Sequence, residues 1–272
     1  MTSTTPDYEL IYHAGIPGRG EFIRLLFEAT ATPYKDSALT DGQAAVKPYM
    51  DGTFQGNHKN PLPFAPPILK HGEVVISQTA NILLYLATHL DSAIDLSPDS
   101  SSSDPSPAKK SKPSPPALQD ASIYHVHGLA LTILDLNNET HDSHHPTSVS
   151  SYYEDQKEEA VKRSEDFRQN RVPKFFGHFE KILGQHEGEE EGGWLLKEAS
   201  HADLCLFQVV DGLKFAFPNL LKKLLPSHPK IETHYEKVKS ASRIKKYLES
   251  ERRQKYSLGV FRYYEELDEP KE

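Results

Sequence analysis

Three consecutive polar residues, Ser77, Gln78 and Thr79, separate an apolar run typical of a strand from one typical of a helix. Polar side chains at a helix start cap exposed backbone amides, and the positive end of a helix is suited to binding a carboxylate. The apolar run before them opens with Pro66 and Pro67, which predicts a backbone held in an unusual geometry such as a cis peptide bond. The segment therefore predicts one half of a small-molecule site.

A second group of chemically capable residues is the histidine cluster that ends at Pro146. His141 and His145 have the i, i+4 spacing that holds zinc when both side chains lie on one helical face. Pro146 disfavours helix at His145, and no third, distant ligand is evident. We therefore favour a polar loop or a helix-end cluster here and expect no metal.

The single cysteine, Cys205, lies in the apolar run from Leu204 to Phe207. A buried, unreactive thiol is the usual state of a cysteine in such a run, so we exclude Cys205 as a nucleophile. A chain with one cysteine forms no internal disulfide, which favours a reducing compartment.

The charge and hydrophobicity of the chain limit the partners and the cellular location that can be expected. Its 272 residues are enough for two modest domains, and 31 Lys and Arg against 39 Asp and Glu give a net charge of -8. That charge argues against a general nucleic-acid or anionic-membrane partner. No apolar stretch approaches the ~20 residues of a membrane span, and residues 1–6 lack the pattern of a signal peptide. We expect a soluble, cytoplasmic protein.

The N-terminal part combines strand and helix patterns. Residues 8–13 alternate, so that Tyr8, Leu10 and Tyr12 share one strand face and Glu9, Ile11 and His13 share the other. A helical stripe over residues 22–29 and a short strand over residues 34–39 follow, and then a hairpin with its turn at His71 and Gly72. This order predicts a parallel crossover, with the hairpin extending the same sheet antiparallel.

The C-terminal part is helical throughout, and residues 97–116 divide it from the first part. That insert is rich in Ser, Pro and Lys and predicts a disordered spacer, with a phosphorylation or docking site as the alternative. Helices are predicted from near Ala117, over residues 149–183 with an interruption or kink near Pro173, from Ser200, and over residues 229–248. Ser200 and Asp203 have the spacing of a capping box.

These pieces together resemble the cytosolic glutathione transferase family. Pro67-Ile68-Leu69 resembles the family's cis-proline strand, and Gln78-Thr79 resembles its Gln-Ser pair with a hydroxyl swap. Tyr12 followed by Gly18-Arg19-Gly20-Glu21 resembles the start of the Tyr-type sigma, pi and mu classes, and Ala202-Asp203-Leu204 after Ser200 resembles the buried capping motif of the helical domain. The segment from Tyr152 to Lys157 is similar to fungal members.

The resemblance implies a fold and a domain order. Its fold class is an α+β thioredoxin-like domain followed by an all-α helical domain, the glutathione transferase architecture. On this chain it implies a glutathione-binding domain over residues 1–96, the linker over 97–116 and the helical domain over 117–272. The helical domain is expected to supply an apolar pocket for a second substrate, and a homodimer is expected.

The resemblance also implies that Tyr12 is the catalytic residue. A free thiol has a pKa of ~8.5, so little of it is thiolate at pH 7. A phenol O–H directed at the glutathione sulfur stabilises the thiolate, and lowering the thiol pKa by ~2 requires about 2.7 kcal/mol. A core tyrosine completing the face of Tyr8 and Leu10 is the alternative. His13 is a second candidate donor, although alternation directs it to the opposite face.

The remaining glutathione contacts implied by the resemblance are spread over the first part. Gln78 and Thr79 are expected to hold the γ-glutamyl carboxylate, Arg19 is either a contact or a surface charge, and Lys47 or Lys59 is expected near the glycyl carboxylate. Pro66 and Pro67 complete the set. Pro66 has no N–H, so one hydrogen bond of ~1 kcal/mol that the family makes to the cysteinyl unit should be absent.

The predicted function is therefore glutathione transfer to a small electrophilic, apolar substrate, with glutathione as co-substrate, no other cofactor and a role in detoxification. Two alternatives stay open. One is a transferase-fold protein without catalysis that binds ligands or regulates partners, and the other is a glutathione-dependent peroxidase or isomerase. The electrophile is not predicted, because pockets for second substrates are apolar and generic.

Overall fold

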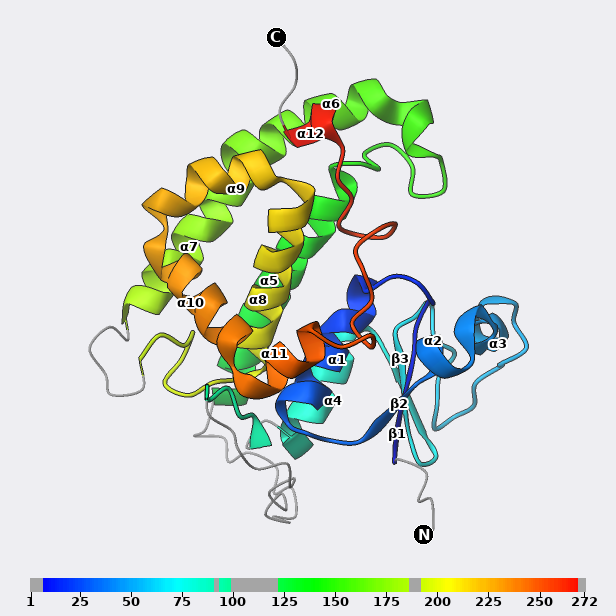
Figure 1. Cartoon of the computed structure of the whole chain (residues 1–272). Coiled ribbons are helices and arrows are strands. Elements are labelled where there is room, and N and C mark those ends of the chain that lie inside the picture. Colours follow the sequence, from blue (N-terminus) through cyan, green and yellow to red (C-terminus); the bar gives the residue numbers. More distant parts are fainter. Residues whose placement is uncertain (1–6, 91–92, 99–121, 186–191, 269–272) are drawn as a thin grey trace. The chain divides into compact units, whose positions relative to one another are not determined.

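A computed structural model describes residues 7–90, 93–98, 122–185 and 192–268 (Figure 1). The chain divides into two compact units, one of residues 1–124 with 241–255 and the other of residues 125–240 with 256–272. The insert predicted over residues 97–116 lies outside the described residues except for its first two. Residues 241–255 group with the first unit, although they follow the helical segment in sequence.

The first unit is built on a mixed sheet of four strands in the order β2-β1-β3-β4. β1 (Tyr8–Ile11) pairs in parallel with β2 (Tyr34–Asp36) and antiparallel with β3 (Ile68–His71), and β3 pairs antiparallel with β4 (Val74–Ser77). The crossover and the hairpin predicted from the sequence are both confirmed. β2 ends earlier than predicted because the Asp36 carboxylate accepts the Ala38 N–H at 3.1 Å and starts a helix.

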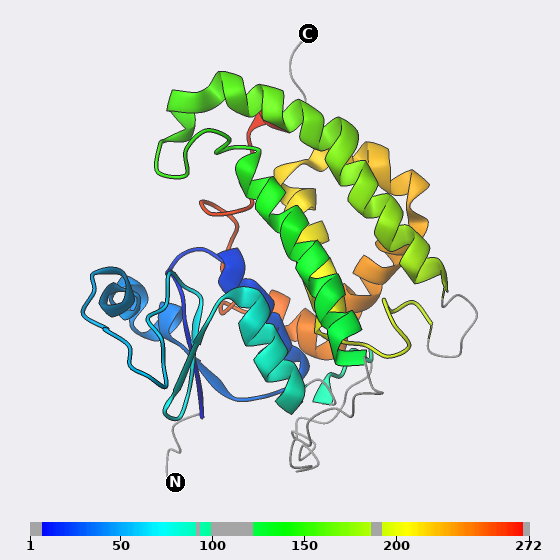
Figure 2. The ribbon, with the colours of Figure 1, turned by 180° about the vertical axis from the view of Figure 1, so that it is seen from behind.

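Helices cover both sides of this sheet. They are η1 (Gly18–Gly20), α1 (Glu21–Ala29), α2 (Ser37–Thr40), η2 (Gly42–Ala45), α3 (Lys47–Met50), α4 (Thr79–Leu90) and α11 (Ser242–Leu248). α1 and α4 lie on one side of the sheet, and α2 and α3 lie on the other (Figure 1). α11 packs against α1 although more than two hundred residues separate them, and Figure 2 shows the same pair from behind.

The second unit has helices, joined by loops, and no strand among its described residues. Its elements are α5 (Ser122–Asp142), η4 (Tyr153–Gln156), α6 (Lys157–Asp166), η5 (Phe167–Arg171), α7 (Val172–Gln185), α8 (His201–Ala216), α9 (Pro218–Leu224), η6 (Leu225–Ser227), α10 (Pro229–Ser240) and α12 (Glu265–Asp268). α10 packs against both α7 and α8. The predicted capping box is present at the start of α8, between Ser200 and Asp203. The helix predicted from near Ala117 is described from Ser122 onward.

The helix predicted over residues 149–183 begins later and is interrupted. It starts with α6 at Lys157, because the side-chain amide of Gln156 accepts the N–H groups of Thr147 and Ser148 and closes a loop before it. The π-helical segment η5 joins α6 to α7 and ends shortly before Pro173. Proline has no N–H for the helical ladder, which accounts for the interruption, and the predicted break near Pro173 is confirmed.

No single helix of the described residues is long and apolar enough to cross a membrane. α8 with the following residues to Ser227 reaches that length and composition only as a pair bent by 117°. Nor do the described ranges contain a group of three or more His, Cys, Asp or Glu side chains placed to hold a metal ion.

The histidines at the end of α5 form a packed, buried group instead. The Nε2 atom of His144 lies 2.9 Å from the Val260 carbonyl oxygen, so Nε2–H donates and Nδ1 accepts. The acceptor Nδ1 is in hydrogen-bond contact with Nδ1 of His145, which must then carry the proton between them. Burial lowers the pKa of His144 to about 3 and that of His145 to about 4. Protonation of His144 at Nδ1 would therefore place its N–H group against the N–H group of His145, so that two donors face each other without an acceptor.

We expect the free energy of unfolding to fall as the pH drops below about 6.5. An unfolded histidine takes up its proton near pH ~6.5, while folded His144 stays neutral to a much lower pH, so the unfolded state binds more protons in that window. The contribution is complete above pH ~6.5, and His144 alone removes about 2 kcal/mol between pH 6.5 and pH 5. Urea unfolding at several pH values measures this slope.

His144→Gln keeps a donor for the Val260 carbonyl but does not titrate. It should flatten the pH dependence, whereas the same change at the exposed His58 should not. An unchanged slope in His144→Gln would contradict the assignment.

Candidate functional site

The strand register brings three of the predicted site positions to one end of the sheet. Ile11 on β1 is paired with Ile68 on β3, and Ile68 is paired with Ser77 on β4. Tyr12 follows the first member of this row, Pro67 precedes the second, and Gln78 follows the third. Because adjacent strands are ~4.8 Å apart, the three positions lie side by side.

Tyr12 is held at this end by the loop before α1. Its hydroxyl accepts the backbone N–H of Arg19 at 2.9 Å, and its side chain is almost wholly buried, with 5% exposed. Burial raises the pKa of the phenol, and the Arg19 N–H and nearby guanidinium groups only partly offset this. The group therefore stays protonated at neutral pH, with its O–H proton available to an acceptor.

Two glycines make room for this tyrosine. A Cβ atom on Gly18 would lie 2.3 Å from the Tyr12 hydroxyl oxygen, and one on Gly20 would lie 2.8 Å from the ring. Gly18 also has a φ of +47°, which a residue with a side chain adopts only at a cost. Glycine is therefore required on both sides of Arg19, because a side chain at either position would collide with Tyr12.

His13 lies beside Tyr12, with the two rings edge-on and 5.4 Å between their centres, and its side chain contacts a different element. Its Nδ1 atom lies 3.0 Å from the Gln43 side-chain nitrogen, and the Gln43 oxygen accepts the N–H of Ala14 at 3.3 Å. Burial lowers the pKa of His13. Gln43 is not predictable from the sequence, because its link to His13 spans thirty positions and leaves no local pattern.

The start of α4 has the features expected of an anion-binding turn. Gln78 has a φ of +71°, a left-handed conformation that costs a non-glycine residue about 1–3 kcal/mol and is concentrated at functional sites. Its carbonyl accepts the Ile82 N–H at 2.8 Å, so Gln78 stands at the cap position. Thr79 is buried, and its hydroxyl oxygen has no hydrogen-bond partner.

The proline pair has the geometry that the sequence predicts. The peptide bond between Pro66 and Pro67 is cis. Pro67 is buried and leads into β3, while Pro66 is partly exposed.

The two predicted cations differ in position. Arg19 lies in η1, and its backbone N–H is the group bound to Tyr12. Lys47 opens α3, and its ammonium forms an exposed ion pair with Asp51 at 2.5 Å. Val46, its neighbour, packs with Ile11 and Ile68, so α3 is anchored beside the same end of the sheet. The alternative cation Lys59 is exposed.

A comparison with family models and a comparison with solved structures both find glutathione S-transferases. Residues 141–251 match the family model described as glutathione S-transferase, C-terminal domain. No curated protein sequence matches the chain.

Solved structures match over most of the chain at low sequence identity. A Pi-class glutathione S-transferase of Onchocerca volvulus is 19% identical, with a TM-score of 0.59 over 89% of this chain and 92% of that one. A prostaglandin synthase D of Nilaparvata lugens is 16% identical, with a TM-score of 0.57 over 90% of this chain and 98% of that one. These likenesses show the fold, an N-terminal mixed sheet with helices followed by a helical domain, which is the glutathione transferase fold.

Proposed function

We propose that this chain, which has the glutathione transferase fold, transfers glutathione to a small, apolar electrophile. Tyr12 donates its hydroxyl proton in a hydrogen bond to the glutathione sulfur and stabilises the thiolate, which is the nucleophile. The protein contributes position and electrostatics to this reaction. The proposal rests above all on one observation, the register that sets Tyr12, Pro67 and Gln78 side by side in the first unit.

The state of the phenol supports this role. Its pKa is raised by burial, so it is a donor rather than a phenolate at neutral pH. The Arg19 N–H occupies a lone pair of the same oxygen at 2.9 Å, which polarises the O–H group and leaves its proton for the sulfur.

The start of α4 is the proposed site for the γ-glutamyl carboxylate. The buried Thr79 hydroxyl without a partner and the positive end of the helix both favour a negatively charged group there. Pro66 offers a carbonyl but no N–H to the cysteinyl unit, so affinity for glutathione is expected to be about 1 kcal/mol weaker than with that hydrogen bond. Lys47 would reach a glycyl carboxylate by giving up its ion pair with Asp51, which is exposed to solvent and therefore weak.

Titration of the bound thiol tests this function. The thiolate absorbance of glutathione bound to the purified protein should appear about 2 pH units below that of free glutathione. A bound thiol that titrates as in free solution would exclude transferase chemistry. Together with tight binding, it would favour the alternative of a ligand-binding or regulatory protein, to which the missing donor at Pro66 lends some support.

A glutathione-dependent isomerase is the second candidate enzyme. One of the similar structures is a prostaglandin synthase D, and such a reaction would use the same thiolate. Assays of the purified protein with electrophiles and with isomerase substrates separate the two.

The proposed setting is the cytoplasm, with a role in detoxification. The single cysteine is buried and is not in a disulfide, which fits a reducing compartment.

We also propose a homodimer. Phe64, in the loop before the cis-proline, has 90% of its surface exposed, and Leu62 close to it has 56% exposed. Covering a phenylalanine side chain contributes about 1.5–3 kcal/mol, so a partner surface for Phe64 would stabilise a dimer.

Phe64→Ser should therefore weaken dimerisation by a factor of about 10–100, measured by sedimentation velocity over a range of concentrations. Leu39→Ser, at another exposed apolar residue of the first unit, is the control and should leave the dimer intact. A wild-type monomer at all concentrations would contradict the homodimer, and an unchanged dimer in Phe64→Ser would exclude this patch.

A further inference from the structure

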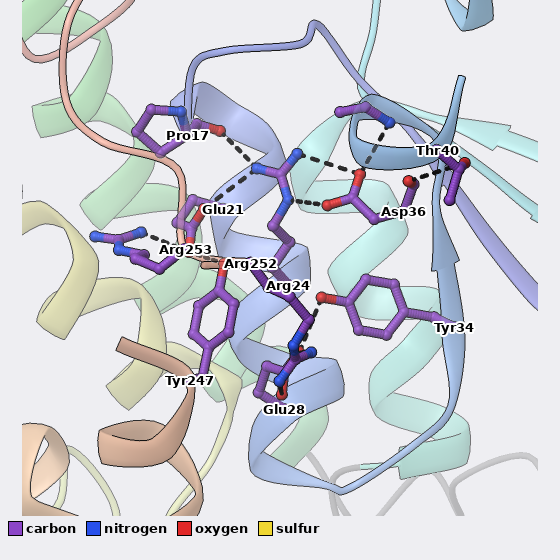
Figure 3. A network of polar contacts seen from close by, with 11 residues as sticks. Pro17, Glu21, Arg24, Glu28, Tyr34, Asp36, Thr40, Tyr247, Arg252 and Arg253 are labelled. Carbon is purple, nitrogen blue, oxygen red and sulfur yellow. Dashed lines mark hydrogen bonds and ion pairs between the residues drawn. The ribbon is translucent and has the colours of Figure 1, made fainter. Parts of the chain in front are cut away.

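A buried arginine lies behind the loop that holds Tyr12. Arg24 on α1 is fully buried, and Figure 3 shows its guanidinium surrounded by oxygen atoms. Its Nε atom donates to the Asp36 carboxylate at 2.6 Å, and its Nη1 atom donates to the Pro17 carbonyl at 3.0 Å and to the Glu21 carboxylate at 3.2 Å. Burial lowers the pKa of this group, but the two carboxylates outweigh burial and raise it. Arg24 is therefore a fixed positive charge.

Arg24 is linked to Tyr12 in two ways, through the Pro17 carbonyl and by its position near the Tyr12 ring. Pro17 immediately precedes η1, whose Arg19 N–H is the donor to the Tyr12 hydroxyl. The guanidinium carbon of Arg24 also lies 5.9 Å from the centre of the Tyr12 ring. One side chain thus fixes the turn that binds the phenol and places a positive charge beside it.

Residues 241–255 of the first unit hold Glu21, the second carboxylate partner of Arg24. The Tyr247 hydroxyl on α11 donates to the Glu21 carboxylate at 2.6 Å, and Arg253 forms an ion pair with the same carboxylate at 2.5 Å (Figure 3). Arg252 pairs with Glu28 further along α1, away from Pro17. Tyr247 and Arg253 therefore hold the Glu21 carboxylate from one side and Arg24 binds it from the other, which fixes the position of the Arg24 guanidinium.

We propose that Arg24 is a positioning residue for Tyr12, which aligns the phenol through Pro17 and makes it a stronger hydrogen-bond donor through its charge. The consequence for a bound thiol rests on the proposed function, whereas the effect on the phenol itself does not. A purely structural arginine would alter the stability of the fold and leave the titration of Tyr12 unchanged.

The test measures the phenol directly in the protein without glutathione. Incorporation of 3-fluorotyrosine gives each of the 13 tyrosines a fluorine signal, and the signal missing in Tyr12→Phe identifies Tyr12. In Arg24→Lys the charge is kept, but a single ammonium cannot bridge Asp36 and Pro17 as the guanidinium fork does. The titration midpoint of Tyr12 should rise by about one pH unit. Arg252→Lys makes the same chemical change on the exposed arginine and should leave the midpoint unchanged.

A second variant moves the midpoint in the opposite direction. Glu21→Gln removes one negative charge beside Arg24, so the positive charge is less balanced and the Tyr12 midpoint should fall. It also keeps the proposal testable when Arg24→Lys does not fold, as judged by circular dichroism. A folded Arg24→Lys with an unchanged midpoint overturns the proposal, as does an unchanged midpoint in folded Glu21→Gln.

Titration of the bound glutathione thiol in the same variants separates the two proposals. The thiol midpoint should rise in Arg24→Lys by about as much as that of Tyr12, with a fall in kcat and little change in the KM for glutathione. Failure of the wild-type protein to ionise the thiol would remove the proposed function, and the fluorine titration would still decide the role of Arg24.

Discussion

Asp203→Ala should lower the free energy of unfolding by about 3–5 kcal/mol. The carboxylate is fully buried and accepts four hydrogen bonds, from the N–H groups of Leu195 and Ser200, from the Ser200 hydroxyl and from Nε2 of His234, at 2.9–3.0 Å. Truncation removes the capping box of α8 and leaves buried donors without acceptors, each of which costs about 1–3 kcal/mol.

Urea unfolding followed by tryptophan fluorescence measures this effect at the site. Trp194, the single tryptophan of the chain, is buried and its ring lies edge-on to that of His234, at 6.1 Å between ring centres. Ser200→Ala is the matched control, because it removes one hydroxyl of the capping box and should cost about 1 kcal/mol. A loss in Asp203→Ala no larger than in the control would show that the four hydrogen bonds contribute little.

The parts of the fold that follow local rules were predictable from the sequence. Alternation over residues 8–13 gives β1 and its two faces, the turn at His71 and Gly72 gives the hairpin, and the spacing of Ser200 and Asp203 gives the cap of α8. Each of these signals lies within a few residues of the structure that it specifies. The cis geometry between Pro66 and Pro67 belongs to the same group.

The parts that depend on distant side chains were not predictable in this way. α6 begins at Lys157 because the side-chain oxygen of Gln156 accepts N–H groups from a loop eight and nine residues earlier. The grouping of α11 with the first unit depends on Tyr247 reaching Glu21, across more than two hundred residues of sequence. Contacts between residues so far apart in the sequence leave no periodic pattern from which they could be predicted.

The candidate site shows the same division. The helix start at Gln78 and Thr79 and the position of Tyr12 at the end of β1 are local features. The role of Arg24 is not, because a charged residue on an otherwise apolar helix face is ordinarily solvent-exposed, and here its burial is balanced by Asp36 from another element. The assignment of Lys47 rested on position alone, and its ion pair with Asp51 makes it the weaker member of the proposed set.

Tyr12→Phe should lower kcat/KM with an electrophilic nitroaromatic substrate by about 100-fold at pH 6.5. Without the phenol O–H, the bound thiol should return toward a pKa of ~8.5, about 2 pH units above its value in the wild-type protein. The thiolate fraction at pH 6.5 then falls by the same factor as the rate. The deficit should disappear above pH ~9, where the thiol ionises without assistance.

A pH–rate profile of kcat/KM separates this role from a structural one. Tyr8→Phe is the matched control, because Tyr8 is a second buried tyrosine on the same strand face, stacked on His71 and adjacent to Phe27. Its loss should leave the profile in place, whereas Tyr12→Phe should shift the acid limb upward by about 2 pH units. A Tyr12→Phe profile that coincides with the wild-type curve would transfer the role to His13 or to backbone donors. His13→Gln would then decide between those two, because its imidazole is the titrating group beside Tyr12.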